Sequence, residues 1–142
     1  MSVLPGSPVM TRSEALRGPA LVGATGLAAA TLLHFHDPHS SGSYGYCPFL
    51  AATGRPCPGC GGLRAVNDLT RGDVAAAISS NVLAVALVVA VGVAWMVWAV
   101  RRARGVNASM ISLGARSGIV LFVGILAFGV LRNTPWGSWL AP

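Results

Sequence analysis

VLAVALVVAVGVAWMVWAV, residues 82–100, is a run of 19 residues without a charged side chain. A helix that crosses the ~30 Å hydrocarbon core of a bilayer needs about 20 apolar residues, so this stretch predicts a transmembrane helix. Trp95 and Trp98 mark its far end, as aromatic residues do at a membrane interface. Asp73 is a good N-cap, and the helix is therefore predicted over residues 74–100.

Two further apolar runs flank this helix. Residues 19–35, PALVGATGLAAATLLHF, predict a first span over about 18–36. A cleaved signal peptide is the alternative, but no small-x-small cleavage pattern follows the run. Residues 117–131, SGIVLFVGILAFGVL, are too few for a span, so the third helix is expected to start near Met110 and to cover about 110–132.

The composition agrees with a membrane protein. Of 142 residues, 54% are apolar and only 10% are charged, against about 25% charged in a soluble domain. This balance excludes disorder, a coiled coil and most soluble folds. We therefore predict a single all-α integral membrane domain, residues 1–142, with three transmembrane helices and a Cys/Gly-rich helical loop between the first two.

The net charge of +6 comes from arginines at the flanks of the apolar runs. No nucleic-acid-binding motif accompanies them, so the expected partner is membrane lipid and not nucleic acid. A cytoplasmic N-terminus places six arginines inside and four outside. The six are Arg12, Arg17, Arg101, Arg102, Arg104 and Arg116, and the four are Arg55, Arg64, Arg71 and Arg132.

This count predicts a multi-pass protein of the bacterial plasma membrane with its N-terminus in the cytoplasm. Residues 1–17 are then a cytoplasmic tail, and residues 133–142, with two tryptophans, lie along the outer membrane surface. The segment 37–73 is expected to be extracytoplasmic or re-entrant.

All three cysteines lie in that segment, in Cys47 and in Cys57-Pro58-Gly59-Cys60-Gly61. A Cys-x-x-Cys spacing lets two sulfurs form a disulfide or chelate one metal ion. A helix that begins just after Cys57 would favour its thiolate. Attachment of c-type haem is excluded because Gly61, not histidine, follows Cys60.

Three interpretations of the cysteines remain open. The first is inert thiols or a bracing disulfide from Cys47 to Cys57 or Cys60, which leaves one thiol spare. The second is thiol–disulfide exchange by Cys57 and Cys60 with Cys47 as the resolving thiol, although no βαβ unit for a thioredoxin fold is present. The third is a metal site. Its candidate ligands are Cys47, Cys57, Cys60 and one histidine, His36 or its neighbours His34 and His39.

The rest of the segment has strong local signals. Residues 63–70 have helical spacing of apolar residues, and Gly72 is suited to the left-handed conformation that ends a helix. Gly59 and Gly61 permit positive φ or a close backbone approach, which indicates a tight turn into that helix. Asn81 is expected to hydrogen-bond across helices.

One spaced pattern joins these residues. It consists of Cys47-Pro48, Gly54, Cys57-Pro58-Gly59-Cys60-Gly61, Arg64, Gly72-Asp73 and Asn81. The pattern resembles the signature of a family of small bacterial membrane proteins of unknown function, and the flanking spans and the late Leu-Arg-Asn-x-Pro resemble its actinobacterial members. The resemblance implies a three-helix membrane protein without an assigned reaction, and relatives that are accessory subunits of the actinobacterial cytochrome bc–oxidase supercomplex.

These observations favour a non-catalytic accessory or assembly subunit of a larger bacterial membrane complex, such as a respiratory supercomplex. The predicted spans contain no acidic residue, and the chain has little mass outside them. Rows of small residues in the helices suit close packing against other integral membrane subunits. A membrane thiol–disulfide oxidoreductase and a metal-binding membrane protein are the alternatives. The sequence identifies no catalytic residue, and the cofactor stays unknown.

Overall fold

The computed structural model describes residues 11–40, 43–111 and 114–140, and this part of the chain is helical without a strand. Most of the predicted tail therefore lies outside the described residues. The elements are α1 (Arg12–Phe35), α2 (Pro48–Thr53), α3 (Gly62–Thr70), α4 (Val74–Ala103), α5 (Ala115–Leu131) and the 3-10 helix η1 (Pro135–Leu140). The predicted all-α class is confirmed for these residues.

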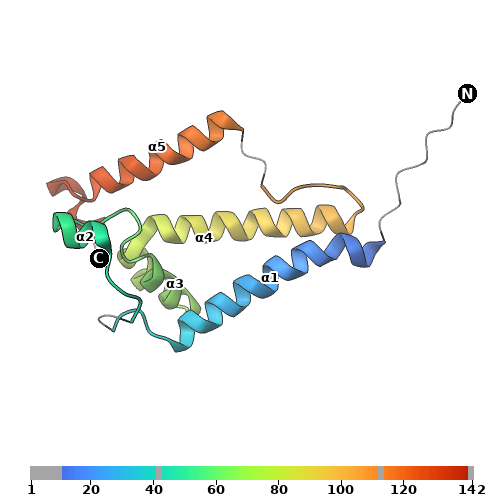
Figure 1. Ribbon diagram of the computed structural model, residues 1–142, viewed down its shortest axis with the longest axis horizontal. Coiled ribbons are helices and arrows are strands. Elements are labelled where there is room, and N and C mark those ends of the chain that lie inside the picture. Colours follow the sequence, from blue (N-terminus) through green and yellow to red (C-terminus); the bar gives the residue numbers. More distant parts are fainter. Residues whose placement is uncertain (1–10, 41–42, 112–113, 141–142) are drawn as a thin grey trace, which may run out of the picture.

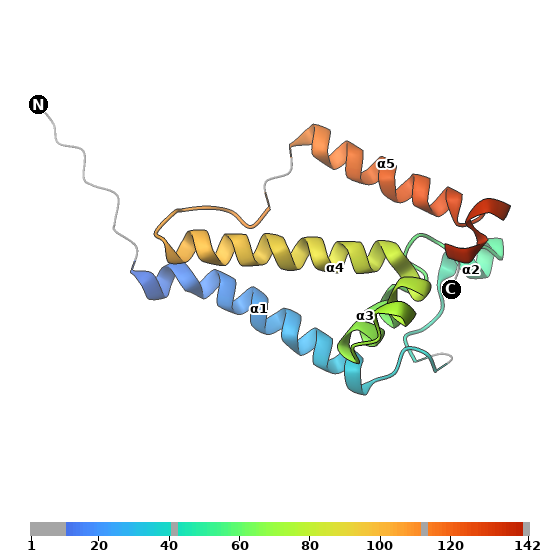
Figure 2. The same cartoon turned by 180° about the vertical axis from the view of Figure 1, so that it is seen from behind.

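Two helices are long and apolar enough to cross a membrane. The 24 residues of α1 and the 30 residues of α4 extend about 36 Å and about 45 Å. They run side by side in opposite directions, and α3 packs at the end where α1 finishes and α4 begins (Figures 1 and 2). With 17 residues, α5 extends only about 26 Å and lies on the other side of α4.

The burial pattern is the reverse of that in a soluble domain. Among the described residues, the buried apolar side chains are Ala15, Pro19, Pro38, Ala65, Ala77 and Leu140, and the buried polar ones are Asn67, Asp68, Asn81 and Arg132. Large apolar side chains point outward, as Leu27 does with 71% of its surface exposed. Such a wide apolar exterior is suited to lipid or to partner helices.

α1 begins at Arg12, so residues 12–17, which were predicted as part of the tail, are helical. Thr11 and Glu14 form a capping box at its start. The Glu14 carboxylate accepts from the Thr11 amide at 2.9 Å, and the Thr11 hydroxyl accepts from the Glu14 amide at 3.4 Å. These two bonds satisfy backbone donors that a helix start otherwise leaves free.

α5 begins later than predicted, at Ala115, so the expected start near Met110 is wrong. The preceding link is held on α4, since Trp98 donates to the Ala108 carbonyl at 2.8 Å and Arg102 donates to the Asn107 side chain at 2.7 Å. Met110 and Ile111, which follow this held stretch, are not helical.

The turn between α3 and α4 follows the sequence prediction. Gly72 has a φ of +79°, and the Asp73 carboxylate accepts from the Ala76 amide at 2.9 Å. α4 then continues to Ala103 with a kink at Asn81, whose φ and ψ are −169° and 98°.

Pro19 explains how α1 and α4 are joined. Proline has no amide hydrogen, so the carbonyl of Ala15, four residues earlier, lacks its usual helical partner. Arg102 of α4 supplies that partner, because its Nε donates to the Ala15 carbonyl at 3.0 Å. Trp95 of α4 donates to the carbonyl of Pro19 itself at 2.9 Å. Polar groups of α4 thus satisfy the backbone of α1.

We expect Arg102→Met to lower the free energy of unfolding by about 1–3 kcal/mol, because the carbonyl of buried Ala15 loses its donor. In a Pro19→Ala background the amide of residue 19 can donate to the Ala15 carbonyl, so Arg102→Met should lower the free energy of unfolding by less. Denaturant unfolding of the four proteins in detergent measures both values. Arg101→Met, at an exposed neighbouring position, is the control. Equal losses in the two backgrounds would contradict this role of Arg102.

Candidate metal centre

Two local turns bring the cysteines together. Cys47 is the N-cap of α2, and Pro48 occupies the first helical position, where its missing amide is harmless. Gly54, with a φ of +68°, ends α2 and reverses the chain. Cys57 and Cys60 follow in a turn closed by a bond from the Cys60 amide to the Cys57 carbonyl at 3.1 Å. The helix after Cys57 is α3, and it begins only at Gly62. The cysteine at a helix N-terminus is therefore Cys47, not Cys57.

The three sulfur atoms form one compact group. Cys57 Sγ lies 3.1 Å from Cys60 Sγ and 3.5 Å from Cys47 Sγ, and all three atoms lie within 4.8 Å of one another. Four thiolates around zinc, each at about 2.3 Å, are about 3.8 Å apart, whereas a disulfide requires about 2.05 Å. All three cysteines are free thiols. Their spacing fits one shared metal ion.

The thiols have unequal acidities. The Leu50 amide and the Cys57 thiol hydrogen-bond to Cys47 and hold its pKa below the usual value. Burial, with the neighbouring Cys57, raises the pKa of Cys60 to about 12. Cys47 is therefore the more nucleophilic of these two, and Cys60 must lose a proton when a metal binds.

We expect iodoacetamide to modify Cys47 well before Cys60 in the reduced, metal-free protein. The thiolate is the reactive form, and at about pH 8 a pKa of about 12 leaves about one Cys60 in ten thousand ionised. Peptide mass spectrometry over a time course measures both rates. In denaturant the two rates should become similar. Faster modification of Cys60 than of Cys47 in the folded protein would contradict this order.

No histidine joins the sulfur group in the part of the chain that the structure describes. His36, the candidate fourth ligand, stacks edge-on against the Tyr44 ring with 5.1 Å between centroids. His34 hydrogen-bonds to Thr70 at 3.0 Å. The third histidine, His39, lies 2.8 Å from Asp37 and 3.4 Å from Asp68. The predicted set of three cysteines and one histidine is therefore not assembled in this structure.

Asn81 holds the cysteine turn from α4. Its side-chain amide donates to the carbonyls of Pro58 and Cys60, at 2.9 Å each, and its oxygen accepts from the Ala84 amide at 2.9 Å. Only 1% of the residue is exposed. The predicted hydrogen bonds of Asn81 thus go to the turn that carries two cysteines, and its oxygen caps the helix after the kink.

Sequence reasoning missed Arg132, which holds the same turn from the end of α5. Only 2% of Arg132 is exposed, and its Nη1 donates to the carbonyls of Cys57 and Cys60 at 2.8 and 3.1 Å, with a longer 3.4 Å contact to Pro58. Its Nε and Nη2 are buried without a hydrogen-bond partner among the described residues. A guanidinium charge is thus buried beside the thiols.

Two neighbours of Arg132 complete this contact. Asn133 donates to the Pro56 carbonyl at 3.0 Å, and Gly129 lies so close to Pro58 that an added Cβ would be 2.6 Å from its Cγ. The late Leu-Arg-Asn-x-Pro was the available signal, since it places polar side chains directly after an apolar helix. The sequence analysis used it only for the family resemblance.

The remaining motif residues have separate positions. Gly61 has a φ of +81° and caps α3, whereas Gly59 and Gly62 do not have positive φ values. Gly72 and Asp73 form the turn from α3 to α4. Arg64 projects from α3 with an exposed side chain.

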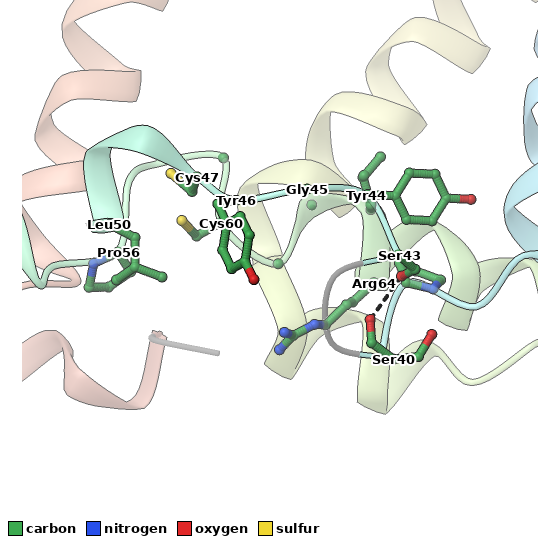
Figure 3. Close-up of a pocket in the computed structure, with 15 residues that line it drawn as sticks. Ser40, Ser43, Tyr44, Gly45, Tyr46, Cys47, Leu50, Pro56, Cys60 and Arg64 are labelled. Carbon is green, nitrogen blue, oxygen red and sulfur yellow. Dashed lines mark hydrogen bonds between the residues drawn. The ribbon is translucent and has the colours of Figure 1, made fainter. Parts of the chain in front are cut away.

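A cavity of about 590 Å³ opens beside the sulfur group. Its lining includes Cys47, Cys60, Tyr46, Leu50 and Arg64. Figure 3 shows the two thiols together at one side of this pocket, with Leu50 next to them, and the guanidinium of Arg64 at another side. Two of the three candidate ligands are therefore accessible from the pocket.

Residues 47–95 match the family model described as "Protein of unknown function (DUF2752)". The match begins at the first cysteine and extends into α4, so it contains the three cysteines and Asn81 but not Arg132. It fits the uncharacterised family that the sequence resembles. No curated protein and no solved structure matches the chain.

Proposed function

We propose that the chain is a small membrane protein that binds one soft metal ion, zinc in the first instance, through Cys47, Cys57 and Cys60. The observation that carries this proposal is the convergence of three free thiols within 4.8 Å. A disulfide would use two sulfurs and leave the third without a partner, whereas a metal ion uses all three. Thiolates are the ligands that soft cations prefer.

The charges near the site support the same proposal. Three thiolates and one Zn²⁺ sum to a single negative charge. Arg132 provides a buried positive charge against the same turn, and part of its guanidinium has no hydrogen-bond partner among the described residues. A buried cation is stabilised by a nearby anion, so the metal–thiolate group and Arg132 offset each other.

The test is the metal content and thiol state of the full chain purified in detergent under mild conditions. We expect one zinc per chain and, after zinc is replaced by Co²⁺, absorption from thiolate-to-cobalt charge transfer. Alkylation with and without reductant, followed by mass measurement, should give three free thiols in both cases. A reductant-dependent mass together with the absence of metal would contradict the proposal and favour thiol–disulfide exchange.

We further propose three spans with a cytoplasmic N-terminus. The start of α1, the end of α4 and the start of α5 carry six of the ten arginines, which supports placing these ends in the cytoplasm. The cysteine turn and the exposed Trp136 and Trp139 then lie on the outer side. A membrane-impermeant maleimide should reach Cys47 in intact cells; labelling only after the membrane is opened would contradict this orientation.

A second function, that of an accessory subunit of a larger membrane complex, is favoured by α5. None of its described residues is buried, and Ile119, Val120 and Phe122 expose more than 60% of their surface. A short helix with such a surface is stabilised by neighbouring helices as well as by lipid. Blue native electrophoresis of gently solubilised membranes should show co-migration with a larger complex; migration only as a monomer would contradict this role.

A further inference from the structure

The proposed metal site lacks one ligand. Zinc is almost always four-coordinate, and sites with three protein ligands leave the fourth position to water or to a bound molecule. The group of ligands found within the described residues contains three sulfurs and no histidine or carboxylate. A metal ion held there must complete its coordination from outside the group.

The pocket gives a small molecule access to that position. Cys47 and Cys60 line the cavity of about 590 Å³, which is within the range of about 300–1,000 Å³ for small-molecule sites. Leu50 and Pro56 form an apolar wall next to the thiols (Figure 3). A ligand that enters the pocket therefore meets the sulfur group directly.

Arg64 indicates that the ligand carries an anionic group as well as a metal-binding atom. It lines the same pocket, and its exposed guanidinium makes no hydrogen bond or ion pair with the described residues. Guanidinium binds carboxylate through two parallel hydrogen bonds. A ligand that spans the pocket would present a metal-binding atom at the cysteines and an anionic group at Arg64.

We propose that the pocket binds a low-molecular-weight thiol that carries a carboxylate. Its sulfur is the fourth ligand of the metal held by the three cysteines, and its carboxylate pairs with Arg64. This inference rests on the proposed metal site. Binding exchanges a coordinated water for a thiolate, and the thiol proton passes to the solvent, so no oxidant or reductant is required.

The experiment uses the reduced full chain in neutral detergent, loaded with one equivalent of Co²⁺. The probe is N-acetylcysteine, with 2-mercaptoethanol as the uncharged comparison. N-acetylcysteine should add thiolate-to-cobalt absorption while the cobalt stays with the protein on gel filtration. Arg64→Gln should weaken N-acetylcysteine binding about fivefold and leave 2-mercaptoethanol binding unchanged. Arg55→Gln, an exposed arginine of the same segment outside the pocket lining, should resemble the wild type.

The outcomes distinguish failure of this inference alone from failure of the proposed metal site. Cobalt absorption typical of three thiolates that neither thiol changes would overturn this inference and leave the metal site standing. An Arg64→Gln protein with the same preference for N-acetylcysteine as the wild type would also overturn it, as would removal of cobalt by the probe. No thiolate-to-cobalt absorption at all would overturn the metal site and this inference together.

Discussion

Replacing Cys57 with serine is expected to lower the affinity of the chain for Zn²⁺ by more than about 100-fold, because loss of a residue that only supports a ligand already costs about 10- to 100-fold. Cys57 is the central sulfur, at 3.5 Å from that of Cys47 and 3.1 Å from that of Cys60. Its replacement removes one of the three ligands and leaves the other two within 4.8 Å of each other. Competition for Zn²⁺ with a chromophoric chelator measures the change.

The pattern across the three cysteines tests whether all three share the metal ion. With one shared metal, Cys47→Ser and Cys60→Ser should weaken zinc binding as strongly as Cys57→Ser. Ser43→Ala, which alters the pocket lining without removing a sulfur, should have little effect. If one cysteine can be replaced without loss of zinc affinity while the other two cannot, the metal is not shared by all three cysteines.

The sequence predicted the elements that depend on local signals. The stop at Gly72 and the cap at Asp73 each act through hydrogen bonds within a few residues, and both are confirmed. The observed starts of α1 and α5 differ from the predicted ones for different reasons. At Thr11 a local capping box with Glu14 was present in the sequence and was overlooked. Before Met110, Asn107 and Ala108 are held by α4, which the sequence of α5 alone does not reveal.

The site depended on contacts that sequence spacing does not encode. The Cys-x-x-Cys spacing predicts the approach of Cys57 and Cys60, but the position of Cys47 follows from the reversal of the chain at Gly54. His36 is near the cysteines in sequence and yet packs on Tyr44.

Arg132, in contrast to His36, is far from the cysteines in sequence but close to them in space. It is 75 residues from Cys57 in sequence and contacts its carbonyl. Counted as one of four arginines outside the membrane, it could be assigned to lipid headgroups as easily as to a protein contact. Only the packing of α5 against the turn distinguishes the two.

Arg132→Ala should weaken zinc binding by about 10- to 100-fold, the range expected for a residue that supports the ligands without touching the metal. Two effects combine. The carbonyls of Cys57 and Cys60 lose a charged donor, so the turn that carries two of the three thiols is held less firmly. The buried positive charge that would offset the negative metal–thiolate group also disappears. Arg132 is a positioning residue in this account.

Loosening of the turn has its own readout. Without Arg132, iodoacetamide should modify the Cys57 thiol of the metal-free protein faster at the same pH, because the turn loses the donor that holds two of its carbonyls and the thiol becomes more exposed. Arg132→Lys should restore the charge but not the planar geometry, and should recover part of the zinc affinity. Arg116→Ala, at the exposed opposite end of α5, is the matched control and should leave both measurements unchanged. Unaltered zinc affinity in Arg132→Ala would show that α5 is not needed to hold the cysteine turn.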